Sequence, residues 1–239
     1  MKSILILGAS SSISKACAEI FAARGYLLFL AGRNLLELEC LSKDLQIRFK
    51  TQVYYSYFDI TAFVSHPDFF KKVLETIGSL YGVLMAVGSL DKKYPHTEII
   101  AANFSGAVSI LDICADYLAS QKKGFIIGLS SVAGDRGRQS NYVYGASKAA
   151  LTTYLQGLRN SLTSHQVHVL TVKLGLIDTK MTFGGSYPIF LAANPEKTGL
   201  KIIKALDKGK ESVYIPKIWR IIMLIIRLIP EKIFKYIKI

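Results

Sequence analysis

A tyrosine and a lysine four residues apart, in Tyr144-Gly-Ala-Ser-Lys148, form the sharpest chemical signal in the sequence. In a helix this spacing puts both side chains on one face, one turn apart. An ammonium about 5 Å from a phenol, at an effective dielectric constant of about 20, is worth roughly 3 kcal/mol, or about two pKa units. That moves the tyrosine pKa toward the range where general acid–base catalysis is efficient. The pair predicts a proton-transfer group, although such a pair alone is also typical of a solvated helix face.

Two further polar residues stand where they can act with this pair. Ser131 lies upstream of Tyr144 at the end of a predicted strand, and its hydroxyl can hold a substrate carbonyl or alkoxide. Asn103 lies in the middle of a long predicted helix, where it can hold a water in a proton relay. We therefore expect a catalytic group of Asn103, Ser131, Tyr144 and Lys148.

The turn after the first predicted strand is suited to phosphate. It reads Gly8-Ala-Ser-Ser-Ser-Ile-Ser14, and a glycine there permits a tight turn. The helix that follows offers free N–H groups and a positive dipole end to a pyrophosphate. A serine-rich turn that merely caps a helix would look the same, so both interpretations stay open. The cofactor hypothesis places the phosphate contacts at Gly8, Ser10, Ser11, Ser12 and Ile13.

The end of the second predicted strand indicates which dinucleotide would bind. It reads Ala31-Gly32-Arg33, without a carboxylate. An acidic residue at this point typically holds a ribose 2′-hydroxyl, whereas an arginine accommodates a 2′-phosphate. This favours NADP(H) over NAD(H), which stays open, and an exposed loop arginine is the alternative. Asp59 ends the third strand, where it can accept from an adenine amino group or cap the next turn.

Strand and helix patterns alternate along the chain and must position these residues. Apolar strand runs fall at 3–7, 26–31, 53–58, 83–87, 125–130, 167–174 and 213–215, with helical spacing at 13–24, 35–45, 68–77, 96–120 and after Asn194. This order implies right-handed βαβ units. We predict a single Rossmann-like three-layer α/β/α domain with a doubly wound parallel sheet over 1–216, and an amphipathic helical tail over 217–239.

Composition narrows the class of protein. The 239 residues suit one α/β domain, and the net charge of +13 favours anionic ligands or acidic lipid surfaces. No helix-turn-helix, zinc finger or basic-aromatic repeat is present, which argues against nucleic acid. Cys17, Cys40 and Cys114 show neither disulfide nor metal-ligand spacing, so we expect no metal and a reducing, cytoplasmic compartment. The apolar run at the N-terminus is too short for a signal peptide.

Taken in order, the glycine turn, Asp59, Gly88, Asn103, Ser131 and the Tyr144/Lys148 pair resemble the short-chain dehydrogenase/reductase family over residues 1 to about 215. The resemblance implies hydride transfer between a nicotinamide and a carbonyl or carbinol. It implies that Ser131, Tyr144 and Lys148 are catalytic, that Asn103 completes the relay, and that the protein is a homodimer or homotetramer. Ser12 and Ser14 stand where the family usually has glycines. Further cofactor contacts are expected at Ile60, Gly88, Tyr144, Lys148, Ile177 and Thr179.

The C-terminal segment 219–230 is apolar but too short to span a bilayer, which takes about 20 residues. With one tryptophan and a basic fringe, it suits a helix lying in a membrane interface, where anionic lipid attracts Lys232, Lys235 and Lys238. We therefore expect peripheral association with the inner membrane. A helix packed in a dimer interface or over the active site is the alternative.

Two loops point to the substrate. Arg136 and Arg138 lie between Ser131 and Tyr144, where guanidinium groups can grip a phosphate; a solvated or subunit-contacting loop is the alternative. The segment 182–193 is the predicted lid over an apolar substrate, with contacts from Phe183 and Tyr187.

The tail, the loop 135–138 and the first strand also resemble the reductase subunits of decaprenylphosphoryl-ribose 2-epimerases and their bacterial relatives. That likeness implies reduction of a 2-keto sugar on a polyprenyl phosphate, with a flavin oxidase as partner. Two other hypotheses remain. The substrate can be a soluble ketone, an acyl-carrier intermediate or a sterol-like alcohol, or the chain can be a nucleotide-binding scaffold without catalysis.

Overall fold

Seven parallel strands form one sheet, in the order β3-β2-β1-β4-β5-β6-β7, in the computed structural model, which describes residues 2–90, 93–179 and 192–237. The chain winds outward from β1 to β3, returns to β4 beside β1, and winds the other way to β7. This places the topological switch point between β1 and β4. The strands are β1 (Ser3–Leu7), β2 (Leu27–Gly32), β3 (Val53–Tyr57), β4 (Gly82–Met85), β5 (Gly124–Ser131), β6 (Val167–Leu174) and β7 (Ser212–Ile215).

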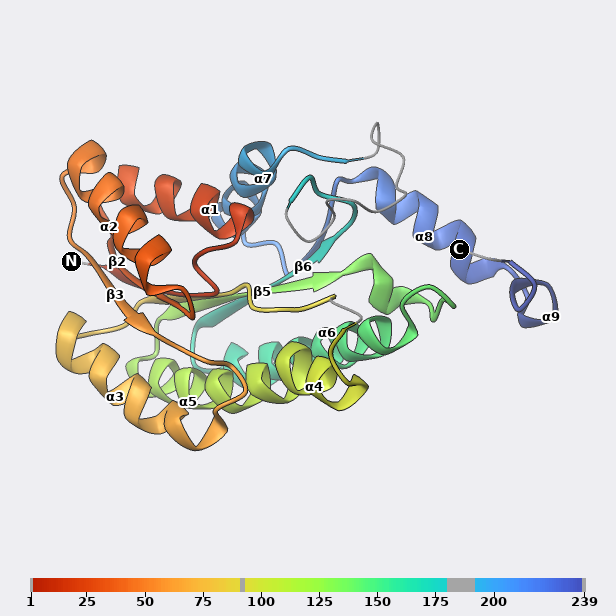
Figure 1. The fold of residues 1–239 in the computed structure, drawn as a ribbon, viewed down its shortest axis with the longest axis horizontal. Helices are drawn as coiled ribbons and strands as arrows, with labels where there is room; N and C mark the ends of the chain where they lie inside the picture. The colour runs from red at the N-terminus through yellow and green to blue at the C-terminus, as the bar shows by residue number, and fades with distance from the viewer. Residues whose placement is uncertain (1, 91–92, 180–191, 238–239) are drawn as a thin grey trace.

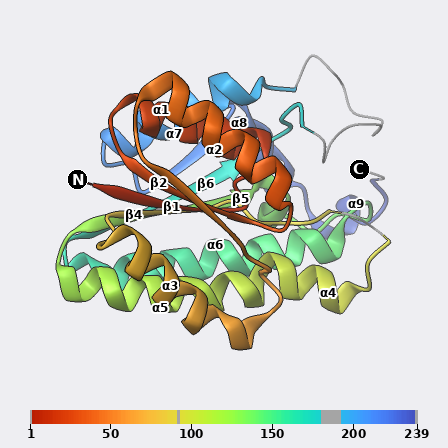
Figure 2. The same cartoon turned by 60° about the vertical axis from the view of Figure 1, so that its left-hand side comes forward.

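Helices cover both faces of the sheet. In Figure 1, α1, α2 and α7 lie above the sheet, and α3, α4, α5 and α6 lie below it; the turned view in Figure 2 keeps the same two layers. The predicted three-layer α/β/α architecture is confirmed. The helices are α1 (Ser12–Ala23), α2 (Leu35–Phe49), α3 (His66–Ile77), α4 (His96–Ile100), α5 (Gly106–Gln121), α6 (Tyr142–Thr163), α7 (Pro195–Asp207), α8 (Ile218–Leu228) and α9 (Glu231–Phe234).

The sheet separates two hydrophobic clusters. Side chains alternate along a strand, so Leu5 and Leu7 of β1 join the cluster under α3, α5 and α6, while Ile4 and Ile6 join the cluster under α1, α2 and α7. Every residue of β1 is buried. A central parallel strand with both faces covered needs such a continuous apolar run, and this run is what predicted the strand from the sequence.

The long helix predicted over 96–120 is the main correction to the expected elements. The chain is helical there, but a π-helical turn, Ala101–Ser105, separates α4 from α5. Asn103 in this turn donates its amide to the carbonyl oxygens of Ser89 and Ile99. The whole stretch His96–Gln121 has the length and hydropathy of a membrane span. Ile110 and Leu111, however, belong to the buried core of the domain.

The tail consists of α8 and α9, with Pro230 between them. Figure 1 shows these helices reaching out past the carboxyl ends of the strands, where α9 lies farthest from the body. α8 begins just after β7, and its contacts are with β7 and with the 3₁₀ turn Val132–Asp135 that follows β5. The tail therefore lies at the same edge of the sheet as the residues singled out for chemistry.

Candidate active site

A cavity of about 440 Å³ opens at the carboxyl edge of the sheet, beside the switch point. Its size is in the range of small-molecule and cofactor sites. The turns after β1, β2, β3 and β4 contribute to its wall, together with the end of β5 and the start of α6. The fold thus brings together twelve of the predicted site residues: Gly8, Ser10, Ser11, Ser12, Ile13, Arg33, Asp59, Ile60, Gly88, Tyr144, Lys148 and Thr179.

Gly8 makes the turn at the floor of this cavity possible. Its φ of +81° lies in the region that favours glycine, and an added Cβ would come within 3.0 Å of the Ala86 carbonyl carbon and the Val87 nitrogen. The amides of Gly8 and Ala9 both donate to the Ala31 carbonyl, at 2.9 and 3.0 Å. The turn is therefore fixed between the ends of β2 and β4, and a side chain at this position would push them apart.

The serine-rich turn caps α1 and also lines the cavity. Ser11 Oγ accepts from the Ser14 amide at 3.1 Å and bonds to Ser14 Oγ at 2.7 Å. Ser14 is fully buried, so its hydroxyl serves the cap. Ser10, Ser11 and Ser12 line the cavity. Backbone amides in the first turn of a helix have no acceptor within the helix, so such amides can bind an anion. The capping and phosphate-binding interpretations are compatible, and the serine at position 14 fits without a glycine.

Arg33 and Asp59 lie at the part of the cavity formed by β2 and β3. Burial acts to raise the pKa of Asp59, but bonds from the Thr61 amide and hydroxyl, at 2.9 and 2.8 Å, and the nearby Arg33 charge outweigh it, so the pKa is lowered. Asp59 therefore remains a carboxylate and caps the turn that follows β3. This is one of its two predicted roles, and the carboxylate still faces the cavity.

Glu37 also lines this end of the cavity and was not predicted. Its carboxylate lies 2.6 Å from Lys15 Nζ, while its backbone amide donates to Asn34 Oδ1 at 3.2 Å. An Asn cap followed three residues later by Glu resembles a capping box. In the sequence this pattern indicates the start of a helix and not a ligand site. Tyr94 and Glu98 also line the cavity and were not predicted. They lie at the start of α4, where the sequence has no strong periodicity. Nothing in the sequence there predicted a site.

Lys148 is the buried cation of the site. Its Nζ donates to the Leu129 carbonyl at 3.2 Å and lies 5.8 Å from the centre of the Tyr144 ring. Burial lowers the pKa of Lys148 to about 8. An added Cβ on Gly88 would lie 3.1 Å from this Nζ and 2.8 Å from Asn103 Oδ1, so a glycine is needed there. The phenol ring and the ammonium share one cavity wall, as their spacing on one helix face predicts.

Asn103 is fully buried behind this wall. Its Nδ2 donates to the Ser89 carbonyl at 2.7 Å and the Ile99 carbonyl at 2.8 Å, and its Oδ1 accepts from the Ser89 amide at 3.0 Å. Both amide protons are therefore used within the protein. The side chain braces the connection between β4 and α4, and its role in a proton relay stays a prediction.

Ser131 ends β5, as predicted, but it does not itself line the cavity. Its Oγ accepts from the Ala133 amide at 3.1 Å and donates to the Leu174 carbonyl at 3.3 Å. Next to it, Ser130 Oγ bonds to the Lys148 carbonyl at 3.0 Å and ties β5 to α6. Ser131 thus lies one residue from the cavity wall, on the strand end that is bonded to the Tyr144 helix.

Ile177 is buried and pairs with Ala193, so it lies behind the cavity and not on its surface. Phe183 and Tyr187, with most of the predicted lid, fall outside the described residues. Among the residues that are described, no group of three His, Cys, Asp or Glu side chains could hold a metal ion.

Arg136 requires a correction. Its Nη1 donates to the carbonyl oxygens of Ile226, Arg227 and Ile229 at 3.1, 2.9 and 2.8 Å. The guanidinium is therefore directed at the end of α8 and not into the cavity, because α8 runs beside this loop. The predicted phosphate grip by Arg136 was wrong. Arg138 in the same loop does not line the cavity either.

Comparisons with known proteins agree with this geometry. The family model described as short chain dehydrogenase matches residues 2–184. An uncharacterised oxidoreductase of Mycobacterium tuberculosis is 29% identical over 97% of this chain and 95% of its own. A short-chain dehydrogenase from Sphingobium yanoikuyae in complex with NADPH superposes with a TM-score of 0.80, at 21% identity over 90% of this chain and 88% of the other.

An alcohol dehydrogenase from the archaeon Thermococcus sibiricus, complexed with 5-hydroxy-NADP, superposes with a TM-score of 0.78, at 25% identity over 90% of this chain and 95% of the other. The family model thus matches most of the length of this chain. The same chain has the doubly wound sheet order, the glycine turn at the switch point and the Tyr144/Lys148 pair on the cavity wall. The protein belongs to the short-chain dehydrogenase family and is an NAD(P)-dependent oxidoreductase.

Proposed function

We propose that the protein is an NADP(H)-dependent reductase that converts a ketone to an alcohol, with Tyr144 as the proton donor. The observation that carries this is the shared cavity, whose lining includes Tyr144 and the buried Lys148 together with the Gly8 turn and Arg33. A bound nicotinamide supplies the hydride for the carbonyl carbon. The residues of this chain bind, orient and deliver the proton.

Tyr144 gives its hydroxyl proton to the carbonyl oxygen as that oxygen becomes an alkoxide. Lys148 favours this transfer because its ammonium stabilises the phenolate that is left. With a pKa of about 8, Lys148 is still mostly protonated at pH 7. Ser131 donates to Leu174 over 3.3 Å, a long bond that its hydroxyl can exchange for one to the substrate oxygen.

Arg33 favours NADP(H) over NAD(H). It follows β2 directly, lines the cavity and can place a guanidinium against a 2′-phosphate. Asp59 and Glu37 share this end of the cavity, but Asp59 is occupied by Thr61 and Glu37 by Lys15. Both carboxylates thus already have partners, and Arg33 supplies the guanidinium that a 2′-phosphate would bind.

For the substrate, we propose the 2-keto group of a sugar linked to a polyprenyl phosphate, in the synthesis of cell-envelope glycans. The support is the tail, which contacts β7 and the turn after β5 at the same edge of the sheet as the site. Its side chains Ile221, Leu224, Ile225 and Leu228 share one face of α8 by their spacing, and each is at least 57% exposed. A lipid-linked substrate is reached most easily by an enzyme whose own apolar face enters the bilayer surface.

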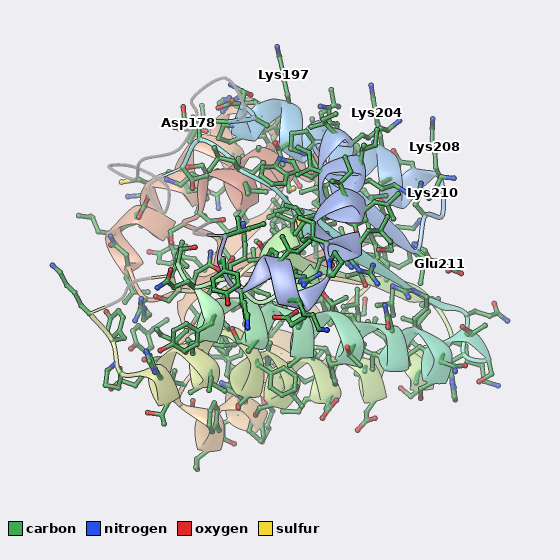
Figure 3. All side chains as sticks on the ribbon, turned by 90° about the vertical axis from the view of Figure 1, so that its right-hand side faces the viewer. Asp178, Lys197, Lys204, Lys208, Lys210 and Glu211 are labelled. Atoms are coloured by element: carbon green, nitrogen blue, oxygen red, sulfur yellow. The ribbon has the colours of Figure 1, made fainter. Side chains whose placement is uncertain are left out.

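The charges of the tail favour an anionic bilayer over a second copy of the chain. Among residues 217–239, six are basic and one, Glu231, is acidic, and Glu231 is bonded to Arg136. Two such tails would repel each other, whereas acidic headgroups attract them. Exposed lysines in and just after α7 add to the net positive charge; Lys197, Lys204 and Lys208 point away from the body (Figure 3).

This proposal places the protein in the cytoplasm, peripherally bound to the inner membrane. The keto substrate must come from an enzyme that oxidises the sugar, so a flavin oxidase is the proposed partner. The protein itself is proposed to be a homodimer or homotetramer joined through the helices that carry Asn103 and Tyr144.

The test pairs the purified protein with membrane lipid extracts and follows NADPH consumption. We expect turnover with extracts that contain the oxidised lipid-linked sugar, and loss of most of it when the chain ends at Pro216. A truncated protein that folds and reduces the lipid-linked ketone as fast as the full chain would contradict the bilayer part. Equal turnover with simple soluble ketones would replace the substrate proposed here.

A further inference from the structure

One side chain of the loop between Ser131 and Tyr144 holds the tail. Besides its three bonds to carbonyl oxygens at the end of α8, Arg136 donates through Nη2 to Glu231 Oε2 at 2.8 Å. Its guanidinium carbon lies 4.1 Å from the centre of the Phe234 ring, and the side chain is only 14% exposed. The last carbonyls of a helix have no intrahelical partner, so Arg136 supplies the cap that the end of α8 otherwise lacks.

The neighbouring residue, Asp135, holds the same loop to the sheet. Its Oδ1 lies 2.6 Å from Lys173 Nζ of β6, and its Oδ2 accepts from the Tyr214 hydroxyl of β7 at 2.7 Å. The Asp135 side chain is 4% exposed. Two consecutive residues thus bind in opposite directions, Asp135 to the sheet and Arg136 to the tail. The loop is therefore bonded to the sheet through one residue and to the tail through the next.

The start of α8 is fixed beside the same strand end. Trp219 packs against Gly175, where an added Cβ would lie 2.1 Å from the indole ring. Gly175 directly follows Leu174, the register partner of Ser131 and the acceptor of its hydroxyl bond. Both ends of α8 therefore contact the segments that position Ser131, while the outer face of the helix is exposed.

We propose that Arg136 is a positioning residue that couples the tail to the loop 132–141, so that docking of the tail on a bilayer orders the substrate side of the active site. The bilayer half of this inference rests on the proposed function, whereas the coupling of tail and loop does not. Arg136 itself does not line the cavity. It acts through the loop that joins Ser131 to Tyr144.

Hydrogen exchange tests the coupling on the full chain, with and without vesicles of phosphatidylcholine and phosphatidylglycerol. In solution, Arg136→Ala should speed exchange in both 132–141 and 218–235 by roughly tenfold or more, because the bonds that close this region are lost. Arg227→Ala is the matched control, since it removes one tail charge but leaves the carbonyl oxygen that Arg136 binds. Exchange in β1 and β4 should not change in either variant, which separates coupling from a general loss of stability.

Vesicles should slow exchange of 132–141 in the wild type and in Arg227→Ala, but not in Arg136→Ala. Equal protection of this loop in Arg136→Ala, or unchanged exchange of that variant in solution, would overturn the inference. If vesicles leave the wild-type tail itself unprotected, the bilayer proposal fails, and with it the ordering of the active site by docking. The solution measurement then still decides whether Arg136 joins tail and loop.

Discussion

Helices α5 and α8 are both rich in aliphatic side chains but have opposite surroundings. α5 buries Ile110, Leu111 and Leu118 completely under the sheet. α8 buries only Met223 completely, and its Leu224 and Leu228 are 57% and 73% exposed. The fold accounts for the apolar face of α5, whereas nothing in the described part of the chain covers that of α8. Lys148 is a second feature that does not favour folding, because burying its ammonium costs stability. Such features are expected at functional sites.

The largest contrast should come from removing one leucine from each helix. Leu111→Ala leaves a cavity in the core and should lower the free energy of unfolding by about 2–5 kcal/mol. Leu224→Ala removes a side chain that water already reaches, so its effect should stay within about 0.5 kcal/mol. Urea denaturation followed by circular dichroism measures both. A large loss for Leu224→Ala would show that the α8 face is packed in solution, as in a dimer.

Lys148→Met should abolish reduction and yet raise the free energy of unfolding, by about 1–3 kcal/mol at pH 7. Burial lowers the pKa of this lysine from 10.5 to about 8, so the folded state pays to protonate it below pH 8. Between pH 8 and 10.5 the unfolded chain binds the extra proton, and wild-type stability gains as pH rises.

The stabilising effect of Lys148→Met should therefore be largest below pH 8 and shrink towards pH 10. Thermal unfolding of both proteins across this range gives the difference. A variant that is less stable than the wild type at pH 7 would mean that the Leu129 bond outweighs the cost of burying the charge.

Arg33→Ala should weaken NADPH binding by roughly tenfold or more and leave NADH binding nearly unchanged, because only NADPH has the 2′-phosphate. Arg24→Ala is the control: it removes an equal charge from an exposed pair with Asp207, away from the cavity. Titration of nicotinamide fluorescence measures both cofactors. An equal loss of NADH affinity would show that Arg33 shapes the turn and does not select the phosphate.

The smallest expected effect concerns the basic side of the tail. Lys232→Gln should weaken binding to anionic vesicles by about 1 kcal/mol, roughly fivefold, and the difference should fade at high salt. Trp219 is the only tryptophan in the chain, so its fluorescence reports docking. Lys43→Gln on α2 is the matched control. The same loss from Lys43→Gln would indicate attraction by net charge and not by the tail.

Local signals in the sequence predicted most of the fold. β6 occupies the predicted bounds, Asn194 caps α7 by accepting from the Lys197 amide at 2.9 Å, and the Gly8 turn lies at the cavity floor. Each of these has a signal within a few residues of the sequence, although Ala31 and Ala86 complete the packing of the Gly8 turn. The spacing of Tyr144 and Lys148 likewise fixed their shared helix face, because helix geometry alone determines it.

Long-range contacts account for what the sequence did not predict. Arg136 binds the carbonyl oxygens of residues that lie 90, 91 and 93 positions later in the chain. No local pattern predicts such a bond. Arg136, a loop arginine between Ser131 and Tyr144, was therefore predicted to bind a substrate phosphate. The π turn at Asn103 depends in the same way on Ser89, which β4 delivers from another part of the sheet edge.

The most direct test of the enzyme assignment is deuteride transfer from 4-deuterated NADPH to a ketone in membrane lipid extract, compared between the wild type and Tyr144→Phe. We predict that Tyr144→Phe binds NADPH as the wild type does, seen by energy transfer from Trp219, and transfers deuteride at least roughly a thousandfold more slowly. Transfer by Tyr144→Phe within tenfold of the wild-type rate would remove the phenol from the mechanism and contradict the account.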